Sequence, residues 1–92
     1  MTVTVRDAPD RSRYEAVVDG DVAGFADYRV SDDRVVFLHV EVAPERQGNG
    51  IATTLVREAM DDVIGRGKTI TPRCPFAVAF VQRFPEYQQY TG

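Results

Sequence analysis

Cysteine and histidine are almost absent from this chain of 92 residues, which has one of each and no tryptophan. The single cysteine, Cys74, cannot form an internal disulfide, and this agrees with a reducing compartment. One cysteine and one histidine fall short of the three or four strong ligands of a usual transition-metal site. We therefore expect neither a disulfide framework nor a metal centre.

Long hydrophobic runs and a basic excess are also missing. No apolar stretch approaches the roughly 20 residues of a membrane-spanning helix, and "MTVTVRDAPDRSR" lacks the apolar segment of a signal peptide. The net charge is -3 and the ten arginines are scattered, which argues against a nucleic-acid surface. These absences predict a cytoplasmic protein with no membrane or nucleic-acid partner.

The composition that is present, 43% hydrophobic and 27% charged, suits one small packed domain. No repeat or linker divides the chain, so we expect a single domain over residues 1–92. Its first half reads as strands separated by turns, and Gly20 in "DGD" predicts a hairpin because glycine tolerates positive φ. The segment 34–43, "RVVFLHVEVA", reads as the longest and most apolar strand, and we place it centrally. The predicted strands are residues 2–6, 13–18, 22–30, 34–43 and 68–72.

The hydrophobic period changes in residues 51–64. Apolar residues recur there every four positions, which predicts an amphipathic helix that ends at Gly65 or Gly67. A second, short helix is predicted over residues 75–84, because proline at a first helical position is preorganised. Phe76, Phe80 and Phe84 would share the core face of that helix.

The order of these elements gives the fold class. The strand 34–43, the helix 51–64 and the strand 68–72 form a βαβ unit, and the earlier strands are joined by short turns. We predict an α+β fold with a mixed, mostly antiparallel sheet, a central βαβ unit and about two helices. The aspartates of the first half, including Asp7, fall mostly in turns and read as solvated.

The segment "PERQGNGIATTL", residues 44–55, places two glycines immediately before the long helix. A tight turn there presents unpaired backbone N-H groups and the positive end of the helix dipole to an anion. Side chains at Gly48 and Gly50 would obstruct a phosphate, and Arg46 adds a full positive charge. The segment therefore predicts a phosphate site.

Three nucleotide motifs compete for this turn. A Walker loop requires Gly-Lys-Ser/Thr, which is absent, and a dinucleotide fingerprint requires a third Gly or Ala where this chain has Thr53. The third pattern is Gln/Arg-x-x-Gly-x-Gly/Ala. Its positions are filled in order by Gln47, Gly50 and Ala52.

With this pattern the sequence resembles the GCN5-related N-acetyltransferases, and in particular their small single-domain branch. The branch carries His-Thr-x-Val, Pro-x-Cys-Pro-Tyr/Phe and Pro-Glu-Tyr segments, which read here "HVEV" (39–42), "PRCPF" (72–76) and "PEY" (85–87). The resemblance covers roughly residues 13–87. Val40 departs from the usual threonine, and the two helices that often build the acceptor pocket in larger members are missing.

The resemblance implies a minimal acetyltransferase fold that binds acetyl-CoA. The pyrophosphate would lie on the backbone amides of the glycine turn. The pantetheine arm would run between the strands 34–43 and 68–72, pairing like an extra strand where they splay apart. The implied cofactor-binding residues are Val40, Val42, Arg46, Gln47, Gly48, Asn49, Gly50, Ile51, Ala52 and Cys74.

Three side chains are candidates for proton chemistry near this cleft. Histidine is the side chain best suited to act as a general base at neutral pH, so His39 is the natural candidate, although it could instead be a hydrogen-bonded core residue. Glu41 shares its face of the strand unless a bulge intervenes, and it could merely neutralise Arg46 or Arg73. Cys74 precedes Pro75 at a helix N-cap, where thiolate is favoured. It could take the acetyl group, protonate the leaving thiolate, line the site or be an inert buried residue.

The predicted function is acetyl transfer from acetyl-CoA to an amine of a small molecule or an exposed protein tail. The first alternative is a non-catalytic acyl-CoA-binding or adaptor domain. The second is a small interaction domain whose glycine turn binds nothing. Either a monomer or a homodimer fits the sequence.

Overall fold

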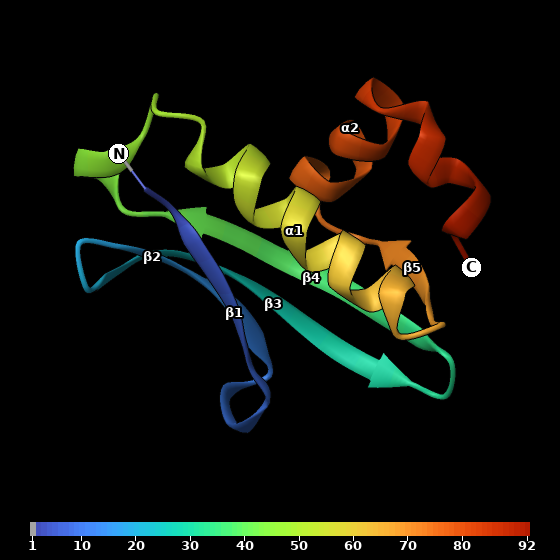
Figure 1. The fold of residues 1–92 in the computed structure, drawn as a ribbon. Helices are drawn as coiled ribbons and strands as arrows, with labels where there is room; N and C mark the ends of the chain where they lie inside the picture. The colour runs from blue at the N-terminus through green and yellow to red at the C-terminus, as the bar shows by residue number, and fades with distance from the viewer. Residues whose placement is uncertain (1) are drawn as a thin grey trace.

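A computed structural model describes residues 2–92 as one five-stranded sheet with two helices (Figure 1). The strands follow one another across the sheet in chain order; the first four are antiparallel, and the fifth is parallel to the fourth. The α+β class and the mixed, mostly antiparallel sheet are thus confirmed. The elements are β1 (Thr4–Ala8), β2 (Arg13–Val18), β3 (Asp21–Ser31), β4 (Arg34–Val42), α1 (Ile51–Gly65), β5 (Thr69–Pro72) and α2 (Pro75–Arg83).

The sheet differs from the prediction at its centre. β3 has 11 residues and β4 has 9, so the prediction that residues 34–43 form the longest strand is wrong. β4 is nevertheless an interior strand, paired with β3 on one side and with β5 on the other. The hairpin between β2 and β3 turns at Gly20, whose φ is +84°, as predicted.

Both helices contribute to one core on one face of the sheet. α1 crosses that face, and α2 lies beside it over the β5 end (Figure 1). The apolar stripe of α1 is buried as its four-residue period requires, and Leu55 and Met60 are fully covered. The fully buried sheet residues beneath include Phe37 and Ile70. The opposite face of the sheet carries no helix in the described residues 2–92.

The second helix departs from its prediction in one residue. Phe80 is buried and Phe84 packs partly against the core, but Phe76 is exposed. The prediction that Phe76 belongs to the core is wrong because Cys74 and Ala77 take the buried positions at this end of α2.

The C-terminal tail forms a 3-10 helix, Pro85–Tyr90, after which Thr91 pairs with Ile70 in a parallel bridge. This short pairing covers part of the outer edge of β5. Neither helix within residues 2–92 combines the length and apolar character needed to span a membrane.

Candidate functional site

The glycine turn after β4 is held together by two side-chain hydrogen bonds, and its outer surface is open. Gly48 and Gly50 have φ values of +88° and +74°, and a Cβ atom at either position would meet nothing within 4 Å. Gln47 Nε2 donates to the Val42 carbonyl at 3.1 Å, and Asn49 Nδ2 donates to the Arg46 carbonyl at 3.3 Å. A hollow of about 110 Å³ results, lined by Val42, Arg46, Gln47, Gly48, Gly50, Ile51, Ala52 and Thr53.

The first turn of α1 leaves its backbone donors unused. Gly50 is the N-cap and has no side chain to offer, and the first amide to bond within the helix is that of Thr54, to the Gly50 carbonyl at 3.1 Å. Over the described chain, the amides of residues 48–53 have no protein acceptor. With the helix dipole behind them, these amides favour a bound anion. The geometry that a pyrophosphate site requires is present, and the assignment of that ligand stays a prediction.

β4 and β5 separate next to this turn. Their pairing runs from Arg34 opposite Thr69 to Phe37 opposite Pro72. The Phe37 carbonyl then accepts from the amides of both Arg73 and Cys74, at 3.0 and 3.2 Å, and the two chains diverge. Within residues 2–92, no strand pairs with residues 38–42 on this side of β4. An extended ligand could therefore hydrogen-bond along this half of β4, as predicted for pantetheine.

A β-bulge in β4 turns its polar half outward. His39 lies opposite Asp27 and Phe37 lies opposite Tyr28, so Leu38 is an extra residue on β4. Strict alternation after the buried Phe37 would send His39 and Glu41 into the core. Instead their side chains are 55% and 62% exposed, while the core packing passes to Val40 and Val42.

His39 and Glu41 form a pair on the uncovered face of the sheet. His39 Nε2 lies 3.2 Å from Glu41 Oε1, so the two side chains share a face as predicted. His39 is not a core residue, and the side chain within hydrogen-bond distance of Glu41 is His39 and neither Arg46 nor Arg73. Arg46 instead lies 3.9 Å from Asp21.

Cys74 lies apart from that pair. Its side chain is part of the core at 6% exposure, and Sγ accepts the Ala77 amide at 3.4 Å as the N-cap of α2. No hydrogen bond in the described residues joins Cys74 to His39 or Glu41. The three predicted catalytic side chains are therefore divided between an exposed pair and a buried thiol, and the role of each stays a prediction.

Sequence reasoning missed an ionic cluster on the same face as His39. Glu15, in β2, is 1% exposed and is held by three arginines, namely Arg6, Arg11 and Arg13. The Arg13 guanidinium also lies 4.7 Å from the centre of the Phe25 ring, which neighbours His39. Alternation along β2 could have placed Glu15 outward, but its partners depend on a strand register that the sequence does not give.

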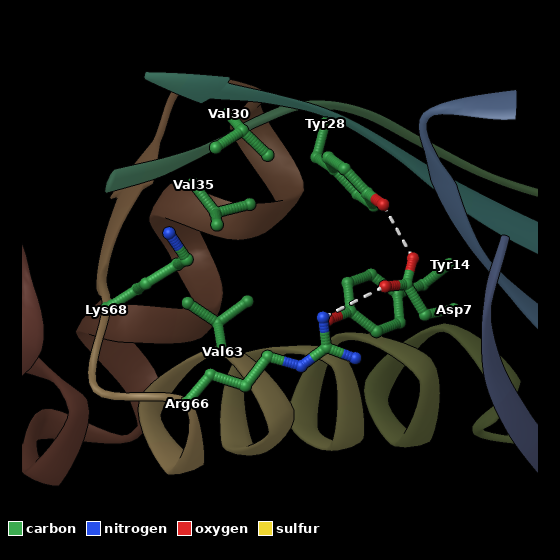
Figure 2. Close-up of a pocket in the computed structure, with 8 residues that line it drawn as sticks. All are labelled: Asp7, Tyr14, Tyr28, Val30, Val35, Val63, Arg66 and Lys68. Carbon is green, nitrogen blue, oxygen red and sulfur yellow. Dashed lines mark hydrogen bonds and ion pairs between the residues drawn. The ribbon is translucent and has the colours of Figure 1, made fainter. Parts of the chain in front are cut away.

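A small cavity of about 40 Å³ lies at the other end of α1 (Figure 2). The Tyr28 hydroxyl donates to Asp7 at 2.6 Å, and Arg66 pairs with the same carboxylate at 3.3 Å. Asp7 was predicted to be solvated, but its side chain is only 15% exposed because it lies in β1 under these two partners. Each polar side chain that lines this cavity has a hydrogen-bond or ionic partner in the protein, which suits a structural role.

Comparison with known proteins identifies the family of this chain. The profile of the GCN5-related N-acetyl-transferase family matches residues 13–90. Streptothricin acetyltransferase from Streptomyces lavendulae is 40% identical over a 63-residue alignment that covers 66% of this chain and 33% of that protein. The chain thus spans about a third of the length of this curated relative.

Solved structures agree on the fold. A GCN5-like protein from Staphylococcus aureus matches with a TM-score of 0.72 at 16% identity, over 97% of this chain and 87% of that one. The ribosomal-protein-S18-alanine N-acetyltransferase of Escherichia coli matches at 0.67 and 21% identity, over 78% and 50%. The PaiA N-acetyltransferase of Thermoplasma acidophilum, solved in complex with coenzyme A, matches at 0.58 and 19% identity, over 80% and 48%. Because the family profile matches most of the chain, from β2 to the C-terminal 3-10 helix, the chain belongs to the GCN5-related N-acetyltransferase family.

Proposed function

We propose that this protein is an acetyl-CoA-dependent N-acetyltransferase that acts on an amine. The observation that carries the proposal is the run of backbone amides from Gly48 to Thr53, which have no protein acceptor among the described residues and lie at the N-terminal end of α1. A diphosphate is the group that such a run suits best, because it accepts several hydrogen bonds and carries negative charge.

The residues present fit the pyrophosphate and the pantetheine arm of coenzyme A. The amides of the glycine turn would hold the pyrophosphate, and Arg46 would add charge at its edge. The absence of Cβ atoms at Gly48 and Gly50 leaves room for the phosphates to approach. The unpaired side of β4, including Val40 and Val42, would bond the pantetheine arm.

The chemistry requires one proton acceptor on this chain. When bound, acetyl-CoA supplies a thioester whose carbonyl carbon forms a bond to the amine nitrogen while its bond to sulfur breaks, and the departing thiolate takes up a proton from water. His39 would accept the proton that the amine nitrogen loses. Glu41, hydrogen-bonded to His39 Nε2, would stabilise the imidazolium that forms.

The experiment that tests this proposal is a calorimetric titration with acetyl-CoA, followed by turnover on a panel of amines. We expect binding in the native chain and in His39→Ala, and turnover at least about 100-fold slower in His39→Ala, because general-base catalysis contributes roughly that much. No binding of acetyl-CoA or CoA at high concentration would refute the proposal.

A non-catalytic acyl-CoA-binding domain is the second candidate. It is favoured by the uncovered sheet face, on which His39 and Glu41 lie without a helix over them in the described chain. Binding of acetyl-CoA without turnover on any amine would support this candidate, whereas sustained turnover on one amine would exclude it.

The same protein and acetyl-CoA can be used to test whether the Cys74 thiol takes the acetyl group. Intact mass after exposure to acetyl-CoA would show an adduct of about 42 Da if the thiol takes the acetyl group, and Cys74→Ala would lack it. We expect no stable adduct, because Sγ is buried and already accepts the Ala77 amide.

A further inference from the structure

A row of contacting side chains crosses the uncovered face of the sheet, and its first member is a buried carboxylate. Glu15 Oε1 pairs with Arg6 at 2.9 Å, and Oε2 pairs with Arg11 at 3.2 Å and with Arg13 at 2.8 Å. Burial alone would raise the pKa of Glu15, but the hydrogen bonds from Arg13 and Arg6 outweigh it and lower that pKa. Glu15 therefore stays ionised at neutral pH and fixes the guanidinium of Arg13.

The row continues from Arg13 to an aromatic ring in β3. The Arg13 guanidinium carbon lies 4.7 Å from the centre of the Phe25 ring, a cation-π distance. The centres of the Phe25 and His39 rings are 6.0 Å apart, and their planes are tilted by 53°. The Phe25 ring is thus in contact with a fixed cation and with the imidazole of the only histidine in the chain.

The row ends at the pair of His39 and Glu41. The charged groups that face the imidazole are Glu41 on its own strand, Asp27 opposite it on β3, and Arg13 beyond the Phe25 ring. In the neutral imidazole, Nε2 must carry the hydrogen to donate to the Glu41 carboxylate. Nδ1 then has the free lone pair that can accept a proton.

We propose that Phe25, backed by Arg13, is a positioning residue for His39. An exposed imidazole on a strand would otherwise rotate between several rotamers and exchange its tautomers. The Phe25 ring restricts that rotation, keeps Nε2 directed at Glu41 and leaves Nδ1 as the proton acceptor. The inference rests on the proposed function and extends it, because it states which nitrogen acts and what holds it in place.

The first test measures the imidazole itself and does not depend on activity. Because His39 is the only histidine, its two nitrogen-15 resonances can be assigned without ambiguity in the full-length protein. We expect the native chain to show mainly the tautomer with hydrogen on Nε2. Phe25→Leu should show a mixture of both tautomers, and Phe25→Tyr, which keeps the ring, should resemble the native chain.

Arg13→Lys provides a second variant that keeps the positive charge beside Glu15 but loses the planar group over the ring. We expect its tautomer mixture to fall between those of the native chain and Phe25→Leu. This variant keeps the proposal testable if Phe25→Leu folds poorly.

The second test separates positioning from binding in the transfer reaction. We expect Phe25→Leu to lower kcat about tenfold with an unchanged KM for acetyl-CoA, because a misplaced base costs rate and not cofactor affinity. Phe25→Tyr should restore most of the rate. Phe76→Leu, at an exposed aromatic residue of α2, should leave both constants and the His39 tautomer unchanged.

Two outcomes would overturn the inference. One is an identical tautomer ratio for His39 in the native chain, Phe25→Leu and Arg13→Lys. The other is an unchanged kcat in Phe25→Leu when His39→Ala is inactive. If no amine is acetylated at all, the proposed function fails, and the tautomer measurement still decides whether Phe25 holds the imidazole.

Discussion

The two ends of helix α1 are finished in opposite ways. At the N-terminal end the cap is Gly50, no side chain bonds the first turn, and the glycine turn is open to solvent. At the C-terminal end the amide of Arg66 bonds to the carbonyls of Asp62 and Val63, and the amides of Gly67 and Lys68 close the turn. Within residues 2–92, the backbone amides at the N-terminal end of α1 are left without protein partners, whereas the backbone groups at the C-terminal end bond within the protein.

The side chains repeat this contrast. Tyr28 donates to Asp7, and Arg66 pairs with the same carboxylate (Figure 2). Asp62 in turn accepts from Tyr14 at 2.5 Å and pairs with Arg66. Polar groups that are hydrogen-bonded to one another stabilise a fold, while polar groups without protein partners are available to bind a ligand. The comparison shows that α1 lacks protein partners from the described chain at its N-terminal end, and this is the end that we propose as the cofactor site.

The largest effect is expected when a carboxylate is introduced at either end of α1, in two separate variants. Gly50 and Gly67 have similar φ values of +74° and +78°, and a Cβ atom at either would meet nothing within 4 Å. We expect Gly50→Asp to weaken binding of CoA by at least about 100-fold, roughly 2.7 kcal/mol, because the carboxylate repels phosphate. The measurement is calorimetric titration.

Gly67→Asp is the matched control for that experiment. Both variants should lose about 1 kcal/mol of stability, since each forces a side chain into a left-handed conformation. Only Gly50→Asp should lose the cofactor. Equal affinities in the two variants would show that the glycine turn is not the phosphate site.

A smaller effect is expected from a substitution beside the C-terminal end of α1. Tyr14→Phe removes a buried hydroxyl that donates to Asp62, and hydrogen bonds to charged groups contribute about 1.5–3 kcal/mol. We expect a loss of about 2 kcal/mol in urea denaturation and no change in CoA affinity. A loss of affinity in this variant would mean that the two ends of α1 are coupled and not independent.

The smallest effect concerns alkaline pH. Burial and the hydrogen bond to Asp62 raise the pKa of Tyr14, and burial and the hydrogen bond to Asp7 raise the pKa of Tyr28. A tyrosine in the unfolded chain has a pKa of about 10. The stability that Tyr14 and Tyr28 contribute is therefore complete below that pH, and it is lost as the pH rises through their higher pKa values in the folded state. Each tyrosine should steepen the decline above about pH 10 by up to roughly 1.4 kcal/mol per pH unit.

Denaturation curves between pH 9 and 11 would measure that slope. Tyr14→Phe and Tyr28→Phe should each flatten it, whereas Tyr90→Phe, at an exposed tyrosine, should not. An unchanged slope in both buried variants would contradict the structural role assigned to this end of the helix.

The features that the sequence predicted are those that local physics determines. Helix α1 follows from a four-residue apolar period, and the turn before it follows from two glycines that adopt positive φ. The βαβ unit follows from the order of its elements. In these cases the residues that decide the structure are close together in the chain.

The features that were missed depend on pairing between distant segments. The bulge at Leu38 exists only relative to β3, and without it a two-residue period would send His39 inward. Likewise, the three arginines around Glu15 come from β1, the turn after it and β2, and they meet only in the folded register. The sequence therefore predicted the candidate residues of the glycine turn and of β4, but it did not predict the cluster of Glu15 and its arginines on the same face as His39.

The separation of β4 from β5 also has a consequence for the protein with no ligand bound. It leaves an unpaired strand edge inside the sheet, at residues 38–42, and such edges recruit extended segments of other chains. That edge is only five residues long, and the extra residue at Leu38 interrupts the even spacing that a foreign strand would need. We therefore expect the irregularity that presents His39 to solvent also to disfavour pairing of this edge with a strand of another chain.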